Sequence, residues 1–167
     1  MKNSFSFWAT AICSMLLLSA CKYSGDYQTV NANNKFSIAL PSWMKETKDL
    51  KPGADLQYAN RFRNFYAIGE TISNTDLQKE MQTNIATLRK SMPDAVVSDS
   101  LDVTAGDLKG VRAEIFGKMS KENIYFSEVL FTGKKGTYHL SIWTRSESRK
   151  LHFKEDINKI IATFKEI

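Results

Sequence analysis

The chain has 167 residues, which is long enough for one domain with its own hydrophobic core. Its 23 basic and 18 acidic residues give a formal net charge of +5, which is too weak to argue for nucleic-acid binding. The sequence contains no Gly-x-Ser-x-Gly, no His-Glu-x-x-His, no phosphate-binding glycine-rich loop and no EF-hand spacing. The common catalytic motifs are therefore absent, and a non-enzymatic protein is expected.

The N-terminus has the layout of a secretory signal peptide. Lys2 is followed by an apolar run from Phe5 to Leu18 and then by small residues. The run is too short to be a comfortable membrane span. The segment Leu18-Ser19-Ala20-Cys21 resembles the bacterial lipoprotein signal, which implies cleavage after residue 20 and acylation of Cys21. The alternatives are an ordinary signal peptide that leaves a free thiol, or an uncleaved anchor.

Lipidation would also settle the cysteine chemistry. Cys13 leaves with the signal peptide and Cys21 carries lipid, so the mature chain has no thiol for disulfides, nucleophilic catalysis or metal binding. Loss of Lys2 leaves 22 basic against 18 acidic residues, a net charge of +4. Two or three acyl chains hold a protein on a bilayer essentially permanently. We therefore expect a bacterial envelope lipoprotein bound to membrane lipid through Cys21, with the outer membrane favoured, on its periplasmic or its surface side.

Residues 21–35 are expected to be the lipidated cysteine and a flexible tether, because residues 22–35 are polar and lack an apolar period. An ordered N-terminal extension is the alternative. Fully extended, such a tether would span about 45 Å. The remaining residues, 36–167, are expected to form a single domain.

The domain opens with period-two segments. Residues 36–40 alternate apolar and small side chains and end at Pro41, after which Trp43 is expected to close one end of the core. Residues 54–62 and 65–72 are expected to form a hairpin across Arg63-Asn64, with Phe62 on an apolar face.

A helix follows the hairpin. Thr75 is expected to cap it, with Gln78 completing a capping box, and Pro93 stops the run. One apolar stripe at helical spacing contains Leu77, Met81, Ile85, Leu88 and Met92.

The period then returns to two. Four strands are expected near residues 95–105, 108–118, 122–132 and 136–144, joined by turns. Residues 124–131 are apolar on both faces, which indicates a central strand covered on both sides. A last helix is expected to carry Leu151, Phe153, Ile157, Ile160, Ile161 and Phe164 and to end with the chain. The order βββαββββα predicts an α+β fold, an antiparallel sheet with a helix on either face.

Several of these segments together resemble the PsbP-like (DcrB-like) family. They are the opening strand that ends in Pro-Ser-Trp, the mid-chain helix, the stretch Leu101-Asp-Val-Thr-Ala-Gly-Asp-Leu-Lys-Gly-Val-Arg-Ala-Glu, and the closing Ile-Ile-Ala-Thr-Phe. The resemblance spans roughly residues 33–167. It implies an α/β/α sandwich and, because known members mostly act by binding other proteins, an interaction module rather than an enzyme.

The histidines offer little chemistry by sequence alone. His139 lies on a strand, and His152 lies on the last helix four residues before Asp156 and four after Ser148. A lone His–Asp pair is usually solvated, and a Ser–His pair without an orienting group is not a triad. We therefore expect no catalytic residue, no metal site and no cofactor, and keep a hydrolase using His139 or His152 as the least favoured hypothesis.

The residues with most potential for recognition are aromatic and basic. They are Trp43, Trp143, Arg145, Arg149, Lys150 and Lys154. Basic side chains near a short tether suit lipid phosphates or an acidic partner, although a solvated face is the simpler interpretation. The leading hypothesis is an envelope lipoprotein that binds an envelope protein, and the alternative is a carrier that holds a small apolar ligand against Trp43 and Trp143.

Overall fold

The computed structural model describes residues 26–73 and 76–167. The signal peptide, Cys21 and Thr75 lie outside these residues. The described elements, in chain order, are β1 (Tyr27–Ala32), β2 (Phe36–Pro41), β3 (Lys45–Glu46), β4 (Leu56–Asn60), β5 (Phe65–Ile72), α1 (Leu77–Ser91), β6 (Val96–Val97), β7 (Leu101–Ala105), β8 (Leu108–Met119), β9 (Glu122–Thr132), β10 (Thr137–Arg145), α2 (Glu147–His152), α3 (Lys154–Ala162) and β11 (Lys165–Glu166).

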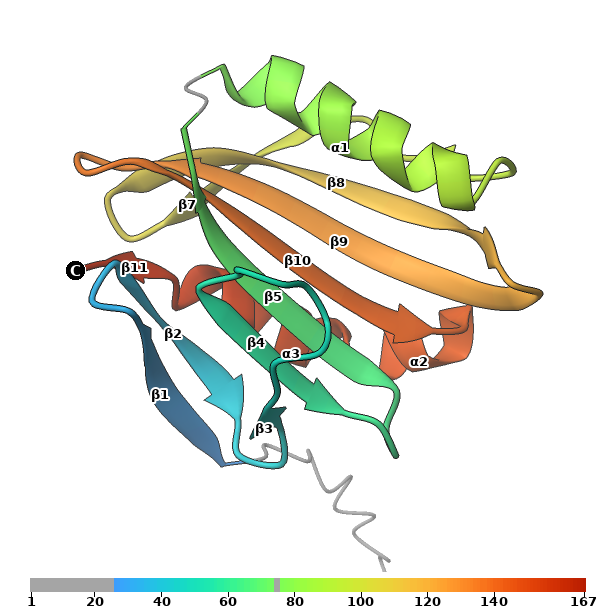
Figure 1. The fold of residues 1–167 in the computed structure, drawn as a ribbon, viewed down its shortest axis with the longest axis horizontal. Helices are drawn as coiled ribbons and strands as arrows, with labels where there is room; N and C mark the ends of the chain where they lie inside the picture. Colours follow the sequence, from blue (N-terminus) through green and yellow to red (C-terminus); the bar gives the residue numbers. More distant parts are fainter. Residues whose placement is uncertain (1–25, 74–75) are drawn as a thin grey trace, which may run out of the picture.

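An antiparallel main sheet organises the described part of the chain. Its strand order is β3-β4-β5-β10-β9-β8-β6, with β7 paired to β8. Helix α1 covers one face, and α2, α3 and a small sheet of order β1-β2-β11 cover the other (Figure 1). The predicted α+β class, with helices on both faces of an antiparallel sheet, is confirmed.

Strand β9 lies in the interior of the main sheet, between β10 and β8. Ile124 and Leu130 point toward the α1 side, while Val129 and Phe131 belong to the core on the other side. Because other layers cover both faces of β9, most side chains on both faces are apolar, and the strand lacks the alternation of apolar and polar residues that one solvent-facing side would give. The predicted central position of residues 124–131 is confirmed.

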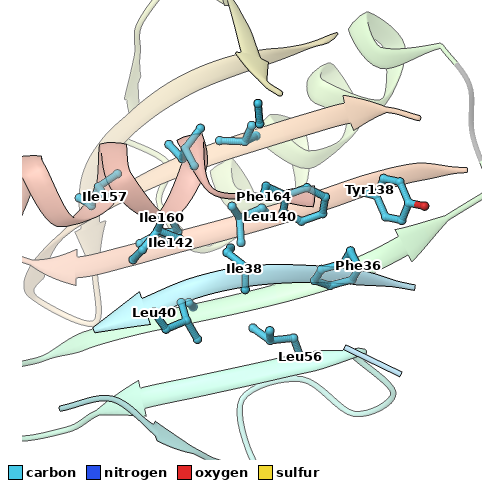
Figure 2. Close-up of a cluster of buried hydrophobic side chains, with 14 of the residues drawn as sticks. Phe36, Ile38, Leu40, Leu56, Tyr138, Leu140, Ile142, Ile157, Ile160 and Phe164 are labelled. Atoms are coloured by element: carbon cyan, nitrogen blue, oxygen red, sulfur yellow. The ribbon is translucent and has the colours of Figure 1, made fainter. Parts of the chain in front are cut away.

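The larger core lies between the main sheet and the layer that contains β2 and α3. Phe36 packs flat on Phe164, with ring centroids 4.8 Å apart, and edge-on against Tyr138 at 5.7 Å. Figure 2 shows side chains from β2, β4, β10, α3 and the segment after α3 meeting in this layer; the labelled residues are Phe36, Ile38, Leu40, Leu56, Tyr138, Leu140, Ile142, Ile157, Ile160 and Phe164. This packing fixes α3 and the small sheet on the main sheet.

Helix α1 packs with the predicted stripe toward β8 and β9. Met81 and Met92 are 1% and 0% exposed, whereas Leu77, Ile85 and Leu88 are half-buried at the margins. The helix begins one residue later than predicted. The Asp76 side chain is the N-cap and accepts a hydrogen bond from the Lys79 amide at 3.0 Å. Aspartate and threonine are both favourable N-cap residues, so the sequence of this segment alone did not decide between Thr75 and Asp76 as the cap.

The predicted tether is wrong for its second half, because Tyr27–Ala32 forms β1 and pairs antiparallel with β2. Only Ala32 is fully buried on this strand, and Val30 is half-buried. Main-chain hydrogen bonds to β2 hold it, and these leave no hydrophobic signature in the sequence. Residues 27–32 are therefore part of the folded domain.

The end of the chain differs from the predicted single helix. It is divided into α2 and α3 at Phe153, whose backbone φ and ψ are −96° and 9°. Helix α3 ends at Ala162, and β11 follows and pairs with β2. Phe164 is 2% exposed but lies beyond the helix, so its helical spacing was coincidental. Phe62, expected on an apolar face, is 93% exposed in the turn between β4 and β5.

Candidate functional site

Trp43 belongs to the core on the α3 side of the main sheet. Its ring lies edge-on to Phe65, with centroids 5.4 Å apart, and 5.6 Å from Phe153. The Arg63 guanidinium lies 5.0 Å above the same ring. This environment matches the predicted role of closing one end of the core.

Trp143 lies on the opposite face of the sheet, the face that α1 partly covers. It stacks between Tyr66 and Phe126, with centroid distances of 5.2 Å and 5.7 Å. In the β10–β5 register Trp143 pairs with Tyr66, whereas Phe65, the neighbour of Trp43, pairs with Thr144. Adjacent residues of a strand point to opposite faces, so the two tryptophans cannot line one groove. The predicted shared groove is wrong.

The predicted basic residues do not form a single free cationic face. Arg145 pairs with Glu122 at 3.0 Å, and Lys150 pairs with Glu114 at 3.0 Å. The Lys150 ammonium also lies 4.3 Å from the centre of the Tyr125 ring.

The two remaining basic residues have no carboxylate partner within the described residues. Arg149 donates to the main-chain carbonyl of Arg63 at 2.7 Å, which links α2 to the turn between β4 and β5. Lys154 is exposed at the start of α3.

A polar cluster lies on the α1 face of the sheet, and sequence reasoning identified only one of its members. Glu128 on β9 is 2% exposed; its carboxylate lies 2.5 Å from His139 Nε2 and accepts a hydrogen bond from Ser141 Oγ at 2.6 Å. His139 Nδ1 lies 3.5 Å from Glu70 Oε2, which is 2.5 Å from Lys51 Nζ. We call these five residues the His139 cluster.

Strand register brings the cluster together. His139 pairs with Glu70 on β5, and Ser141 pairs with Glu128 on β9. His139 and Ser141 are two residues apart on β10, so they share a face. The only trace of the cluster in the sequence was a set of polar residues at strand positions that face inward. Such residues predict a cluster only when it is known which strands lie next to one another.

The electrostatics of the cluster favour a protonated imidazole. Burial would lower the pKa of His139, but the charges and hydrogen bonds of Glu128 and Glu70 outweigh it and raise that pKa to about 9. The hydrogen bond from His139 lowers the pKa of Glu70 against the opposing effect of burial, and Lys51 lowers it further. At neutral pH the cluster therefore contains a histidinium between two carboxylates.

This arrangement differs from that of a serine–histidine–carboxylate triad. A triad needs a neutral imidazole nitrogen that accepts the proton of the nucleophile. In the cluster both ring nitrogens face carboxylates, and Ser141 donates to Glu128 rather than to His139. The cluster is a mostly buried ion-pair network in which the imidazole is not directed at the serine.

A cavity of about 200 Å³ lies between α1 and strands β5, β9 and β10, and all five residues of the His139 cluster line it. Trp143 and Phe126 form its aromatic wall, and Asn84 and Thr87 of α1 line it on the other side. The Nδ2 atom of Asn84 is buried without a hydrogen-bond partner among the described residues. The cavity thus combines an aromatic wall, the charged groups of the His139 cluster and one unpaired amide donor.

The other histidine lies in a different environment. His152 is exposed and touches Phe153 edge-on, and Asp156 accepts a hydrogen bond from Tyr27. Ser148 Oγ contacts Ser146 Oγ at 3.1 Å. No group of three or more metal-ligating residues occurs in the part of the chain that the structure describes.

Another hollow, of about 560 Å³, lies where the turns before β8 and β10 meet β11. Glu166, which lines it, accepts hydrogen bonds from the main-chain amides of Lys134 and Lys135 at 3.0 Å and 2.6 Å and from the Tyr138 hydroxyl at 2.7 Å. These bonds tie the C-terminal strand to the sheet and leave the carboxylate engaged within the fold. Separately, none of the helices formed by residues 26–73 and 76–167 has the length and apolar content to cross a bilayer.

The described residues thus form an α+β fold, in which helices lie on both faces of an antiparallel main sheet. No protein-family model matches the sequence, and a search of curated proteins returns no significant match. The solved structures, however, do show the same architecture.

Three solved structures illustrate this likeness. The PsbP homologue CyanoP of Synechocystis superposes with a TM-score of 0.63 at 12% identity, covering 90% of this chain and 99% of that chain. The Ran-binding protein Mog1p of Saccharomyces cerevisiae gives a TM-score of 0.56 at 12% identity, covering 84% and 95%. LpqN of Mycobacterium tuberculosis, involved in cell envelope biogenesis, gives 0.55 at 12%, covering 84% and 90%. The predicted PsbP-like fold is confirmed, and at these identities the likeness concerns the fold alone.

Proposed function

We propose that this protein is a lipid-anchored accessory module of the bacterial cell envelope, which acts by binding an envelope protein rather than by catalysis. The observation that carries the non-enzymatic part is the His139 cluster, where the buried histidine has both nitrogens directed at carboxylates. The location is supported by the Leu18-Ser19-Ala20-Cys21 signal in the sequence. A neighbour on the same fold, LpqN, is involved in cell envelope biogenesis, which agrees with this location.

The anchor is tested with the full chain expressed in a bacterium that processes lipoproteins. We expect metabolic labelling with a radioactive fatty acid and recovery in the membrane fraction. Cys21→Ala should abolish the labelling and leave uncleaved precursor, whereas Cys13→Ala, inside the expected signal peptide, should change neither the labelling nor the membrane recovery. Lipid labelling that persists in Cys21→Ala would contradict the anchor.

The binding role is tested by site-specific photo-cross-linking in cells. A benzoylphenylalanine at Lys154, which is exposed at the start of α3, is expected to give one discrete adduct with another envelope protein. The matched control places the same group at Gln82, which is exposed on α1. Absence of a discrete adduct from Lys154, or the same adducts from both positions, would argue against a partner at the α3 side.

A second candidate function is binding of a small ligand in the 200 Å³ cavity, and the unpaired Asn84 amide beside Trp143 is the observation that favours it. Quinoline, an apolar double ring whose nitrogen accepts a hydrogen bond, is a suitable probe of such a site, because the unpaired Asn84 Nδ2 is a donor. Thr87→Phe should fill the cavity and abolish any binding measured by calorimetry, whereas Thr83→Phe, exposed on the same helix outside the cavity lining, should not. No heat of binding with the unsubstituted protein would remove apolar ligands of the size of quinoline from consideration.

A further inference from the structure

The turn between β4 and β5 presents an apolar side chain directly to solvent. Phe62 at its tip is 93% exposed, the highest value among the large apolar side chains described, and Arg61 and Arg63 flank it. The turn is held in shape, since the Arg63 amide donates to Asn60 Oδ1 at 2.8 Å and the Asn64 amide donates to the Arg61 carbonyl at 3.3 Å. An ordered turn therefore projects the aromatic ring outward.

This turn lies beside the point where the chain enters the domain. The carbonyl of Asp26, the first described residue, accepts a hydrogen bond from the Ser42 amide at 2.7 Å. Trp43, which follows Ser42, accepts a hydrogen bond at its main-chain carbonyl from Asn60 Nδ2 at 2.8 Å, and the Arg63 guanidinium lies above its ring. Figure 1 shows the start of β1 and the end of the β4–β5 hairpin on the same lower side of the molecule. A short chain of contacts therefore links residue 26 to the hairpin tip.

The connection to the expected lipid is much shorter than the sequence suggested. Because β1 takes up Tyr27–Ala32, only residues 22–25 separate Cys21 from Asp26. Five residue steps span at most about 18 Å, compared with about 45 Å for a tether that reached Lys35. An anchored Cys21 would therefore keep the hairpin side of the domain close to the bilayer at all times.

The charges on this side suit an anionic surface. Arg61 pairs with Asp49, but the two side chains are 65% and 60% exposed, so the pair is weakly held and open to exchange with phosphate. Arg149, which reaches the same turn through the Arg63 carbonyl, has no carboxylate partner among the described residues. Arginine beside an exposed aromatic ring is a common arrangement at lipid head groups, where the ring enters the interface and the cation meets phosphate.

We propose that the β4–β5 hairpin docks on the bilayer that anchors Cys21, with Phe62 in the head-group region and Arg61 and Arg149 toward lipid phosphates. This inference rests on the lipid anchor of the proposed function. The docked hairpin would hold the domain in one orientation relative to the bilayer. In that orientation α1 and the His139 cluster would be directed away from the hairpin edge of the sheet, which is the edge at the bilayer.

The test uses the full lipidated chain with a single nitroxide label. Phe62→Cys supplies the thiol, since lipidated Cys21 cannot react, and the protein is reconstituted into vesicles of phosphatidylethanolamine and phosphatidylglycerol. The control is Val96→Cys on β6, which is 70% exposed and lies at the opposite edge of the main sheet. Power-saturation electron paramagnetic resonance then compares the accessibility of each label to oxygen and to a water-soluble nickel complex.

The expected result is a label at position 62 that is several-fold more accessible to oxygen than to nickel, and a label at position 96 with the reverse preference. Protein that floats with the vesicles while both labels remain in water would overturn the docking and leave the anchor intact. Protein that fails to float would overturn the anchor and the docking together. A depth at position 62 that is equal on vesicles of phosphatidylcholine alone would contradict the pairing of arginine with anionic lipid.

Discussion

Glu128 Oε2 lies 2.5 Å from His139 Nε2 on a sheet face where most neighbouring side chains are apolar. A buried carboxylate is costly unless it is paired and hydrogen-bonded, and Glu128 obtains both from His139 and Ser141. The pair therefore links the stability of the sheet to the charge of one histidine.

Stability is expected to fall as the pH rises from about 6.5 to about 9. His139 has a folded-state pKa of about 9 against an ordinary value of 6.5, so the charged form is favoured by folding. A raised pKa contributes stability that is complete below 6.5 and is lost as the pH rises through 9. The loss should be about 1 to 3 kcal/mol, measured by urea unfolding at pH 6 and pH 9.

His139→Gln should flatten this pH dependence and His152→Gln, at an exposed position, should preserve it. Glu70 acts in the opposite direction, because its lowered pKa gives stability that is lost as the pH falls below about 4.5. An unchanged slope in His139→Gln would show that another group controls the alkaline loss.

Side chains of the α1 stripe should differ in their contribution to stability. Met81 is 1% exposed and packs against Val111 and Leu130, so Met81→Ala should lower the free energy of unfolding by about 2 to 4 kcal/mol. Leu88 is half-buried at the edge of the helix contact, and Leu88→Ala should cost about 1 to 2 kcal/mol. Equal losses in the two variants, measured by thermal or urea unfolding, would mean that the helix is rotated from this orientation.

These two helix positions show what the sequence can predict. The 3.6-residue period of α1 and the two-residue period of β8 to β10 each report burial by a repeated apolar spacing, and both were predicted from it. The pairing of Glu70 with His139 depends on strand register between segments that are far apart in the chain, and no local pattern carries that information. The separation of Trp43 from Trp143 was hidden for the same reason. Trp43 contacts Phe65 and Trp143 contacts Tyr66, and these two neighbours on β5 point to opposite faces of the sheet.

Strand β1 is expected to be part of the folded domain. Ala32 is 2% exposed in the core, so Ala32→Glu would bury an unpaired carboxylate. This substitution should lower the free energy of unfolding by about 2 kcal/mol or more. Asn31→Glu, one residue earlier and exposed, should stay within about 0.5 kcal/mol of the unsubstituted protein. If both substitutions were neutral in urea unfolding, residues 27–32 would be a tether after all.

Phe153 is expected to be among the most sensitive positions because it joins α2 to α3 and fills the core at their junction. It is 3% exposed, its ring centroid lies 4.8 Å from that of Phe65, and it also contacts Trp43. Phe153→Ala would leave a cavity at the end of the core and should cost about 3 to 5 kcal/mol, with a loss of near-ultraviolet circular dichroism from Trp43. Leu151→Ala, on the preceding turn and 66% exposed, is the matched control and should cost less than about 0.5 kcal/mol. A small effect of Phe153→Ala would mean that α2 and α3 form one continuous helix in solution, with Phe153 outside the core.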